Sequence, residues 1–197
     1  MSTGFYRAFV YRNGHMTNLG TLGGNYSAAY AINKSSQVVG ESATSANLQH
    51  AFPMGGGVMT DLGTLGGTAP SESTLAYGIN DSGTIVGYSY LPDGNFHGFV
   101  YSQGKMTDIG ALYTYSSGLA INNSGAIVGS ADIRNNTGYE VYHAVIFEKG
   151  KPVDLNTLIP AGSAWVLTSA TSINAGGAIV GYGQIGGVSH GFLLTPQ

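Results

Sequence analysis

The sequence has no cysteine, few charged residues and no long apolar run, and each shortage excludes a class of structure. Without cysteine, disulfides cannot be what holds this domain together. No window approaches the roughly 18 apolar residues of a membrane-spanning helix, so we expect no transmembrane segment. The first residues, "MSTGFYRAFVY", have neither a basic region nor an apolar core, so we expect no signal peptide here.

Charge is scarce as well. Charged residues make up 9 % of the chain, against about 25 % in ordinary soluble proteins, and the net charge is −3. The seven lysines and arginines are scattered, whereas a nucleic-acid partner requires a clustered basic surface. We therefore expect no nucleic-acid binding. A low-charge composition rich in Tyr, Asn, Ser and Gly favours a secreted or cell-surface location.

What the sequence does contain is one unit of roughly 47 residues, repeated through a single domain that spans 1–197. The third copy reads "HGFVYSQGKMTDIG" and then "SSGLAINNSGAIVGSA". A fixed period of this length is typical of solenoids and propellers. The copies are 7–49, 50–96, 97–142 and 143–189, followed by a partial copy at 190–197.

Each unit predicts four short strands. Gly104 can supply the positive φ of a two-residue hairpin loop between "HGFVYS" and "MTDIG", and Asn-Ser-Gly marks a second turn. The fold class is therefore all-β, and we expect a small β-propeller of four-stranded blades, with four blades favoured and five as the alternative. Four blades would close if 16–20 paired with the surplus strand at 190–195. The recurring Gly of "IVG" predicts close backbone approach near a crowded central axis.

The phrases "HAF", "DLGTLGG", "AYGINDSG" and "IVGYS", in this order, resemble the HAF repeat of extracellular bacterial proteins. The resemblance covers about residues 7–194. It implies an exported or surface repeat protein without an assigned activity, so no functional residue is carried over from it. The first unit departs from the pattern with Arg7 in place of the histidine, and the fourth carries "LNTLIPAGSAW" in place of the Gly-Gly crossover.

Histidine and aspartate recur eleven residues apart in three units. A hairpin turn at 103–104 places Phe99 opposite Asp108, so His97 and Asp108 become diagonal neighbours within reach. We interpret these pairs as structural, because histidines on separate blades are too far apart to share a metal ion. We expect no metal and no cofactor. The pairs are His50 with Asp61, His97 with Asp108, and His143 with Asp154, while Arg7 and Asn18 take these places in the first unit.

Aromatic residues are the best candidates for binding, at 11 % of the chain. Phe9, Phe52, Phe99, Phe147 and Phe192 are expected in the core. Tyr and Trp in diverging loops present a flat apolar face with a polar edge, which suits a sugar ring or a protein partner. The predicted ligand-binding residues are Tyr26, Tyr90, Tyr113, Tyr115, Tyr139 and Trp165.

These observations favour a non-catalytic extracellular binding module of lectin type, with a glycan as the first candidate ligand. The alternative is a structural or adhesive surface repeat protein that contacts other proteins, with self-association through its end strands. A third hypothesis is an enzyme with a site in a central channel. No convergent pair of carboxylates and no nucleophile motif in the sequence supports it.

Overall fold

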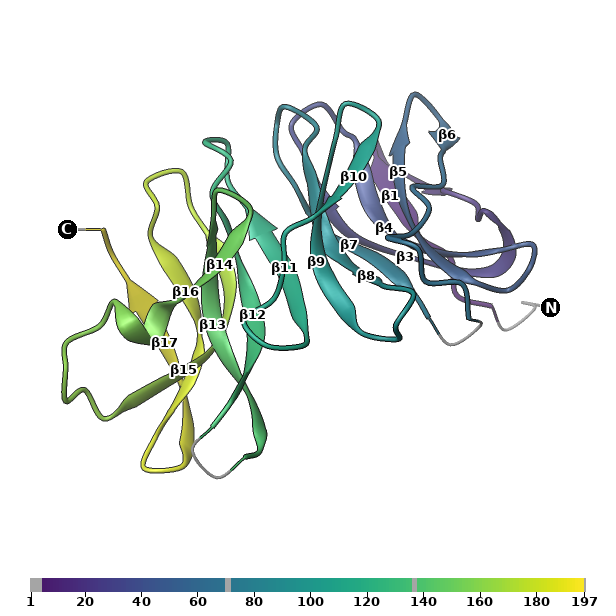
Figure 1. The fold of residues 1–197 in the computed structure, drawn as a ribbon. Coiled ribbons are helices and arrows are strands. Elements are labelled where there is room, and N and C mark those ends of the chain that lie inside the picture. Colours follow the sequence, from purple (N-terminus) through teal and green to yellow (C-terminus); the bar gives the residue numbers. More distant parts are fainter. Residues whose placement is uncertain (1–4, 70–71, 136–137, 197) are drawn as a thin grey trace.

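The computed structural model describes residues 5–69, 72–135 and 138–196, which form small antiparallel sheets placed one behind the other (Figure 1). One short 3-10 turn, η1 (Leu155–Thr157), is the only helical element among the described residues, and no helix there could span a membrane. The predicted all-β class is confirmed. The strands are β1 (Phe9–Arg12), β2 (His15–Asn18), β3 (Gly23–Ile32), β4 (Val38–Thr44), β5 (Gln49–Gly55), β6 (Val58–Met59), β7 (Thr74–Ile79), β8 (Ile85–Tyr90), β9 (Phe96–Ser102), β10 (Lys105–Asp108), β11 (Ser116–Ile121), β12 (Ile127–Arg134), β13 (Glu140–Glu148), β14 (Lys151–Asp154), β15 (Trp165–Ile173), β16 (Ile179–Ile185) and β17 (Val188–Leu194).

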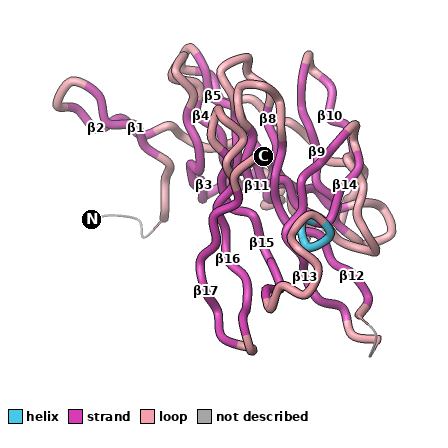
Figure 2. Tube along the Cα trace, turned by 90° about the vertical axis from the view of Figure 1, so that its left-hand side faces the viewer, coloured by secondary structure: helices cyan, strands magenta, loops and turns pink. Residues whose placement is uncertain are grey.

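Three of the five sheets are complete four-stranded meanders: β3–β6, β7–β10 and β11–β14. The first sheet contains only β1 and β2, and the last contains only β15, β16 and β17. Each complete sheet joins the last two strands of one sequence unit to the first two of the next. Among the described strands, β2 pairs with β1 and β17 pairs with β16, so the ring-closing pairing considered for 16–20 is not formed. Figure 1 places the first and last sheets at opposite ends of the array, and Figure 2, viewed from the side of the last sheet, shows β1 and β2 apart from β15–β17.

The hairpins form where the turn chemistry predicts them. Gln103 and Gly104 both have positive φ, at 53° and 78°, as a two-residue type I′ loop requires. Asn13–Gly14 and Lys149–Gly150 repeat this geometry. A right-twisted loop of this kind matches the strand twist, so each turn fixes the pairing register of its hairpin.

The recurring glycine of the second strand faces a β-bulge in its own sheet. Opposite Gly87, the register steps from Ala76 to Gly78 and leaves Tyr77 unpaired. A Cβ on Gly87 would overlap the carbonyl oxygen of Leu75. The predicted close approach is therefore confirmed, but its cause is the bulged partner strand rather than a central axis. The same overlap recurs at Gly40, Gly129 and Gly181.

The core consists of separate apolar layers, one between each two successive sheets. Val39 of β4, for example, packs with Phe99 of β9, and both are fully buried. Burial of a side chain of this size contributes about 2 kcal/mol. Phe52, Phe147 and Phe192 are buried as expected, whereas Phe9 is 54 % exposed. The expectation is wrong for Phe9 because its side of β1 has no sheet packed against it among the described residues.

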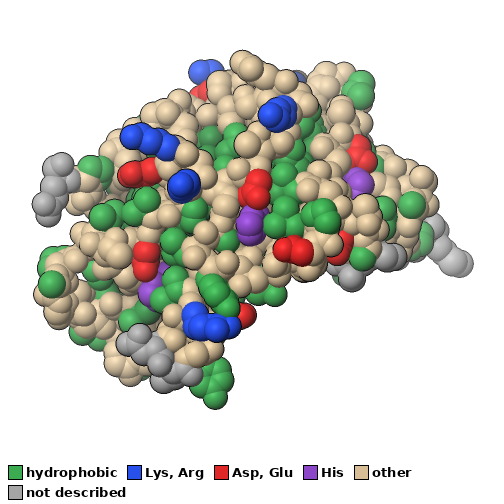
Figure 3. All heavy atoms as spheres, in the orientation of Figure 1, with side chains coloured by type: hydrophobic (Ala, Val, Ile, Leu, Met, Phe, Trp, Pro, Cys, Tyr) green, Lys and Arg blue, Asp and Glu red, His purple; other side chains and the backbone are tan. Residues whose placement is uncertain are grey.

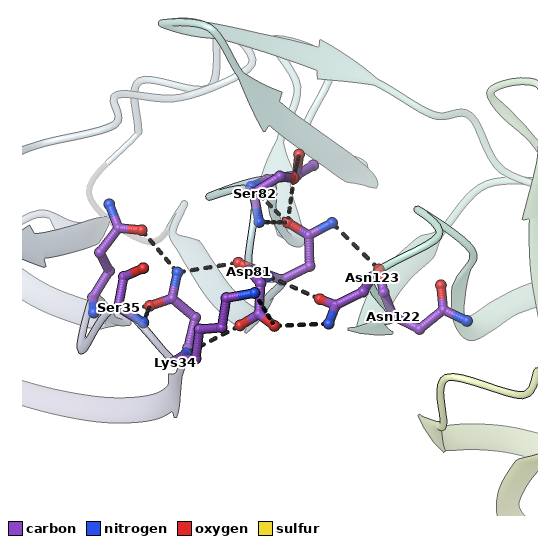
Figure 4. Close-up of polar contacts among 10 residues, drawn as sticks. Lys34, Ser35, Asp81, Ser82, Asn122 and Asn123 are labelled. Atoms are coloured by element: carbon purple, nitrogen blue, oxygen red, sulfur yellow. Dashed lines mark hydrogen bonds and ion pairs between the residues drawn. The ribbon is translucent and has the colours of Figure 1, made fainter.

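A column of asparagines links the sheets at the turns after their first strands (Figure 4). The side-chain oxygen of Asn80 accepts the N–H groups of Ser82 and Thr84, which shapes its own turn. Its side-chain nitrogen donates to the carbonyl of Asn122 in the next sheet, at 3.3 Å. Each turn is thereby fixed internally and to its neighbour. The other two steps of this asparagine ladder run from Asn33 to the carbonyl of Asn80 (3.1 Å) and from Asn122 to that of Asn174 (3.0 Å).

Candidate functional site

The β-bulges set the direction of the first two side chains of the candidate site. In β3 the pairing with β4 steps from Ala29 to Ala31 and leaves Tyr30 unpaired, as Tyr77 is in β7. A bulge redirects the side chain that it leaves unpaired. The rings of Tyr30 and Tyr77 lie 5.4 Å apart between centroids, although they belong to different sheets.

From Tyr77 the aromatic contacts continue across the sheet β7–β10. The centroid of Tyr77 lies 5.9 Å from that of Tyr88, which lies 5.1 Å from Phe96. Phe96 stacks on Tyr115 at 4.7 Å, and Tyr90 contacts Phe96 at 5.5 Å. None of these residues is fully buried, so each keeps part of its surface in contact with solvent. This aromatic row comprises Tyr30, Tyr77, Tyr88, Tyr90, Phe96 and Tyr115.

A buried carboxylate lies at the start of the aromatic row. Glu41 of β4 is only 5 % exposed, and its Oε1 accepts hydrogen bonds from the hydroxyls of Tyr30 (2.5 Å) and Tyr26 (3.1 Å). No lysine or arginine among the described residues forms an ion pair with it. Its charge is therefore held by neutral hydroxyl donors, which stabilise a buried carboxylate without cancelling its charge.

A second buried carboxylate lies at the other end of the aromatic row. Asp132 of β12 is fully buried, and its Oδ1 accepts the backbone N–H groups of Thr114 (2.8 Å) and Tyr115 (2.5 Å). Its Oδ2 is the one buried side-chain nitrogen or oxygen of the described residues without a hydrogen-bond partner. Two carboxylates without basic partners thus flank a row of electron-rich ring faces, so the site favours neutral or positively charged ligand groups.

The tyrosine hydroxyls around Glu41 stay protonated. Burial, followed by the hydrogen bond and charge of Glu41, raises the pKa of Tyr30 well above its usual value of 10.0. Burial and the neighbouring charges of Tyr88 and Glu41 raise the pKa of Tyr77 to about 12. Burial also raises the pKa of Tyr26 and of Tyr88. At neutral pH these groups are hydrogen-bond donors or acceptors and not bases.

Three of the six predicted ligand-binding residues belong to this site or adjoin it. Tyr90 and Tyr115 are members of the aromatic row, and Tyr26 contacts Glu41. Tyr113 lies under the guanidinium of Arg134, 4.8 Å from its ring centroid. That contact places a cation on a tyrosine two residues from the row.

The structure does not bring the other two predicted residues to the aromatic row. Tyr139 is 73 % exposed and makes no ring contact with the described residues. Trp165 lies in the last sheet, where its ring meets His190 edge-on at 6.1 Å. It lines a shallow hollow with Ile159, Pro160 and Leu194.

Sequence reasoning missed Tyr30, Tyr77 and Tyr88, which lie inside predicted strands, and Phe96, which directly precedes the predicted strand "HGFVYS". A signal was present, because Tyr30 and Tyr77 occupy the same place in "AYAIN" and "AYGIN". A tyrosine repeated at one strand position indicates a bulge or a shared surface. In a regular alternating strand, that position would face either the core or the solvent in every copy.

The three His–Asp pairs form as the hairpin register predicts. The Nδ1 atom lies 2.8 Å from an aspartate oxygen at His50–Asp61, 2.9 Å at His97–Asp108 and 2.7 Å at His143–Asp154. Each aspartate also accepts a backbone N–H two residues later, as Asp108 does from Gly110. The aspartate therefore joins its hairpin to the crossover towards the next sheet.

The Asp154 carboxyl has a shifted pKa, and the first unit lacks the corresponding contact. Burial alone would raise the pKa of Asp154, but hydrogen bonds from His143 and Asn156 outweigh it, and the pKa lies below the usual 3.8. In the first unit the predicted contact between Arg7 and Asn18 is not formed. Arg7 instead donates to backbone carbonyls of Tyr6 and Asn25, because its longer side chain reaches past the hairpin.

The histidines do not converge on a shared ligand. Figure 3 shows those on the visible face apart from one another, each beside an acidic side chain. No group of three or more His, Cys, Asp or Glu within 5–69, 72–135 and 138–196 could hold a metal ion. Metal binding in these sites takes several ligands about 2 Å from one point.

Comparison with known proteins gives one match. No curated protein and no solved structure matches the chain. A family model matches residues 66–189, a span that includes Tyr77 and Tyr115 of the aromatic row but neither Tyr30 nor Glu41. Since the matched span is more than half of the 197 residues, the chain belongs to the family described as "Protein of unknown function (DUF3466)".

Proposed function

We propose that this chain is a non-catalytic module that binds carbohydrate along the aromatic row. The observation that carries the proposal is the unbroken run of partly exposed rings from Tyr30 to Tyr115, with neighbouring centroids 4.7 to 5.9 Å apart. Rings of this kind stack on the apolar faces of sugars, while tyrosine hydroxyls bond sugar hydroxyls. Repeated weak stacking contacts along one chain sum to useful avidity.

The charges around the aromatic row narrow the ligand class. Glu41 and Asp132 carry no basic partner among the described residues. An acidic glycan would meet like charge, which costs affinity, whereas a neutral or amine-bearing glycan would not. We therefore assign neutral and amine-bearing polysaccharides to the Glu41 end of the row, whereas the Arg134 guanidinium on Tyr113 offsets the negative charge near the Tyr115 end.

Binding of purified chain to neutral, amine-bearing and acidic oligosaccharides, measured by glycan array and calorimetry, tests this function. Tyr30→Ala, whose ring is 44 % exposed, and Tyr90→Ala should weaken binding about tenfold each, as loss of one stacked ring does. The matched control is Tyr139→Ala, a 73 % exposed tyrosine with no ring contact in the described residues. Trp165→Ala should also have no effect. Equal losses in the control, or no glycan binding by folded protein, would sink the proposal.

A structural or adhesive surface protein is the second candidate function. It is favoured by the apolar side chains that the last sheet exposes, among them Val180, Val188 and Leu193. This function predicts that the folded chain binds no glycan, whether or not it associates with itself.

The finer architecture and the location are proposals too. We propose that the sheets are the blades of a propeller-like array of HAF repeats, with four or five blades. Support comes from the four antiparallel strands of each complete sheet and from the repeated bonds between neighbouring sheets. We also propose a secreted or cell-surface location, which fractionation of cells that produce a tagged chain would test.

A further inference from the structure

Within the part of the chain that the structure describes, the outer face of the last sheet lacks the cover that every complete sheet receives. Val39, Val86 and Val128 hold one repeat position in β4, β8 and β12, and each is fully buried against the sheet that follows. Val180 holds that position in β16 and is 43 % exposed. By strand register its face also carries Val166, Tyr182 and Leu193, which are 44, 54 and 63 % exposed. Three buried copies of this interface indicate that a further sheet of the same kind covers the face.

Among residues 5–69, 72–135 and 138–196, the opposite end of the array also lacks a complete cover. Ile32 of β3 is 56 % exposed, while Ile173 holds the same repeat position in β15 and is 9 % exposed against the preceding sheet. The first sheet covers only part of this end, because β1 and β2 correspond to the third and fourth strands of a complete sheet. The last sheet has the first three strands and lacks the fourth. The last sheet therefore lacks the strand that β2 represents, and the first sheet lacks the two that β15 and β16 represent, while both carry a third strand, β17 and β1.

The asparagine ladder is open at the same two ends. Asn80 and Asn122 each accept two bonds at the carbonyl, one from their own turn and one from the preceding asparagine. The carbonyl of Asn33 accepts only its own turn bond, from Ser36, among the described residues. At the far end the side-chain nitrogen of Asn174 donates to no described residue. A free donor at one end matches a free acceptor at the other (Figure 4 shows two of the three closed steps between them).

We propose that two copies of this chain associate head to tail, with the β15–β17 face of one copy on the β3 end of the other. Asn174 of the first copy continues the ladder to Asn33 of the second, and Val180 is buried as Val39 is. The contact is heterologous, so it adds further copies or closes into a ring of several. The second copy is the occupant because each end carries the half-interface that the other end completes.

The mass of the chain in solution, measured by light scattering over a range of concentrations, tests the proposal. Wild type should grow in mass with concentration. Val180→Lys puts a charge in the β15–β17 face of every copy, and Ile32→Lys puts one in every β3 end. Each variant alone should therefore be a monomer. Mixed together, they should form one heterodimer, because each keeps the face that the other lost. Val58→Lys, which is 65 % exposed in β6, is the control and should associate like wild type.

Two results would overturn the proposal. A wild type that stays monomeric at all concentrations means that no copy covers these faces, whether they stay open or close within one chain. A mixture that stays monomeric means that the two faces do not bind each other. Circular dichroism of each variant establishes that it is folded, and Val180→Thr and Ile32→Thr give milder versions of the same mixing experiment if a lysine variant is not.

Discussion

The side-chain nitrogen of Asn33 donates a hydrogen bond to the backbone carbonyl of Asn80, 3.1 Å away and 47 residues later in the chain. Both residues are more than nine-tenths buried. The same side chain shapes its own turn through Oδ1, so one residue type satisfies the local backbone and fixes the spacing to the next sheet. Beside it Lys34 and Asn123 both bind the Asp81 carboxylate (Figure 4).

Replacing Asn80 by Asp should separate the two roles of this residue. The variant keeps the oxygen that accepts from Ser82 and Thr84 but puts an acceptor opposite the Asn122 carbonyl. A buried donor lost in this way costs about 1–3 kcal/mol of unfolding free energy. Urea denaturation measures the loss. In monomeric protein, Asn174→Asp is the matched control at the exposed end of the ladder and should change stability by less than about 0.5 kcal/mol.

Gly87→Ala should prevent folding or cost more than about 3 kcal/mol, because the new Cβ would overlap the Leu75 carbonyl oxygen in the bulged strand. Gly55→Ala in β5 is the comparison. Its Cβ would meet nothing closer than the Gln37 side chain at 3.6 Å, so it should change stability little. Thermal unfolding of both variants decides the matter, and similar losses in the two would contradict the role given to the bulge.

Stability should fall in acid through Asp154. Its pKa is lower in the folded chain than the usual 3.8, so the stabilisation is complete above that value and is lost as pH falls through the folded pKa. Asp154→Asn should therefore lower the unfolding free energy at neutral pH by about 1–2 kcal/mol and have a smaller effect near about pH 2. Glu148→Gln, an exposed change in the same sheet, controls for the lost charge. A loss independent of pH would rule out the linkage.

Ionisation of Tyr77 should lower the unfolding free energy at high pH. Its pKa is about 12 in the folded chain and 10.0 otherwise, so its contribution is complete below 10.0 and is lost as pH rises towards 12. Tyr77→Phe should make the unfolding free energy fall less steeply over that range. Glu41→Gln should lower the pKa of Tyr77, because the charge of Glu41 is one of its causes. Ultraviolet titration of tyrosinate follows both effects, and an unchanged titration in Tyr77→Phe would refute the assignment.

The local features of the fold were predictable from the sequence. The turn at Gln103–Gly104 sets the hairpin register, and that register alone places His97 beside Asp108. Both inferences needed only the two-residue period of a strand and the φ preference of glycine. The asparagine turns followed in the same way, but their bonds to the next sheet did not.

The aromatic row could be predicted only in part. Tyr90 and Tyr115 were selected because the repeats diverge there, whereas Tyr30 and Tyr77 read as ordinary strand positions. A bulge shifts the alternation by one residue, and nothing in the strand pattern alone says which residue it leaves unpaired. Trp165 also lies where the repeats diverge, but the structure places it in the last sheet, where its ring contacts His190.

The sequence by itself determined the all-β class, the repeat, the hairpin turns and the His–Asp contacts, because these depend on residues within about one hairpin of each other. Only the tertiary structure decided which strands share a sheet, that Glu41 and Asp132 flank one aromatic row, and that the two ends stay apart. Those outcomes depend on how whole sheets stack. The stacking sums many small contacts between residues some 47 positions apart, and no local pattern encodes its angle or its closure.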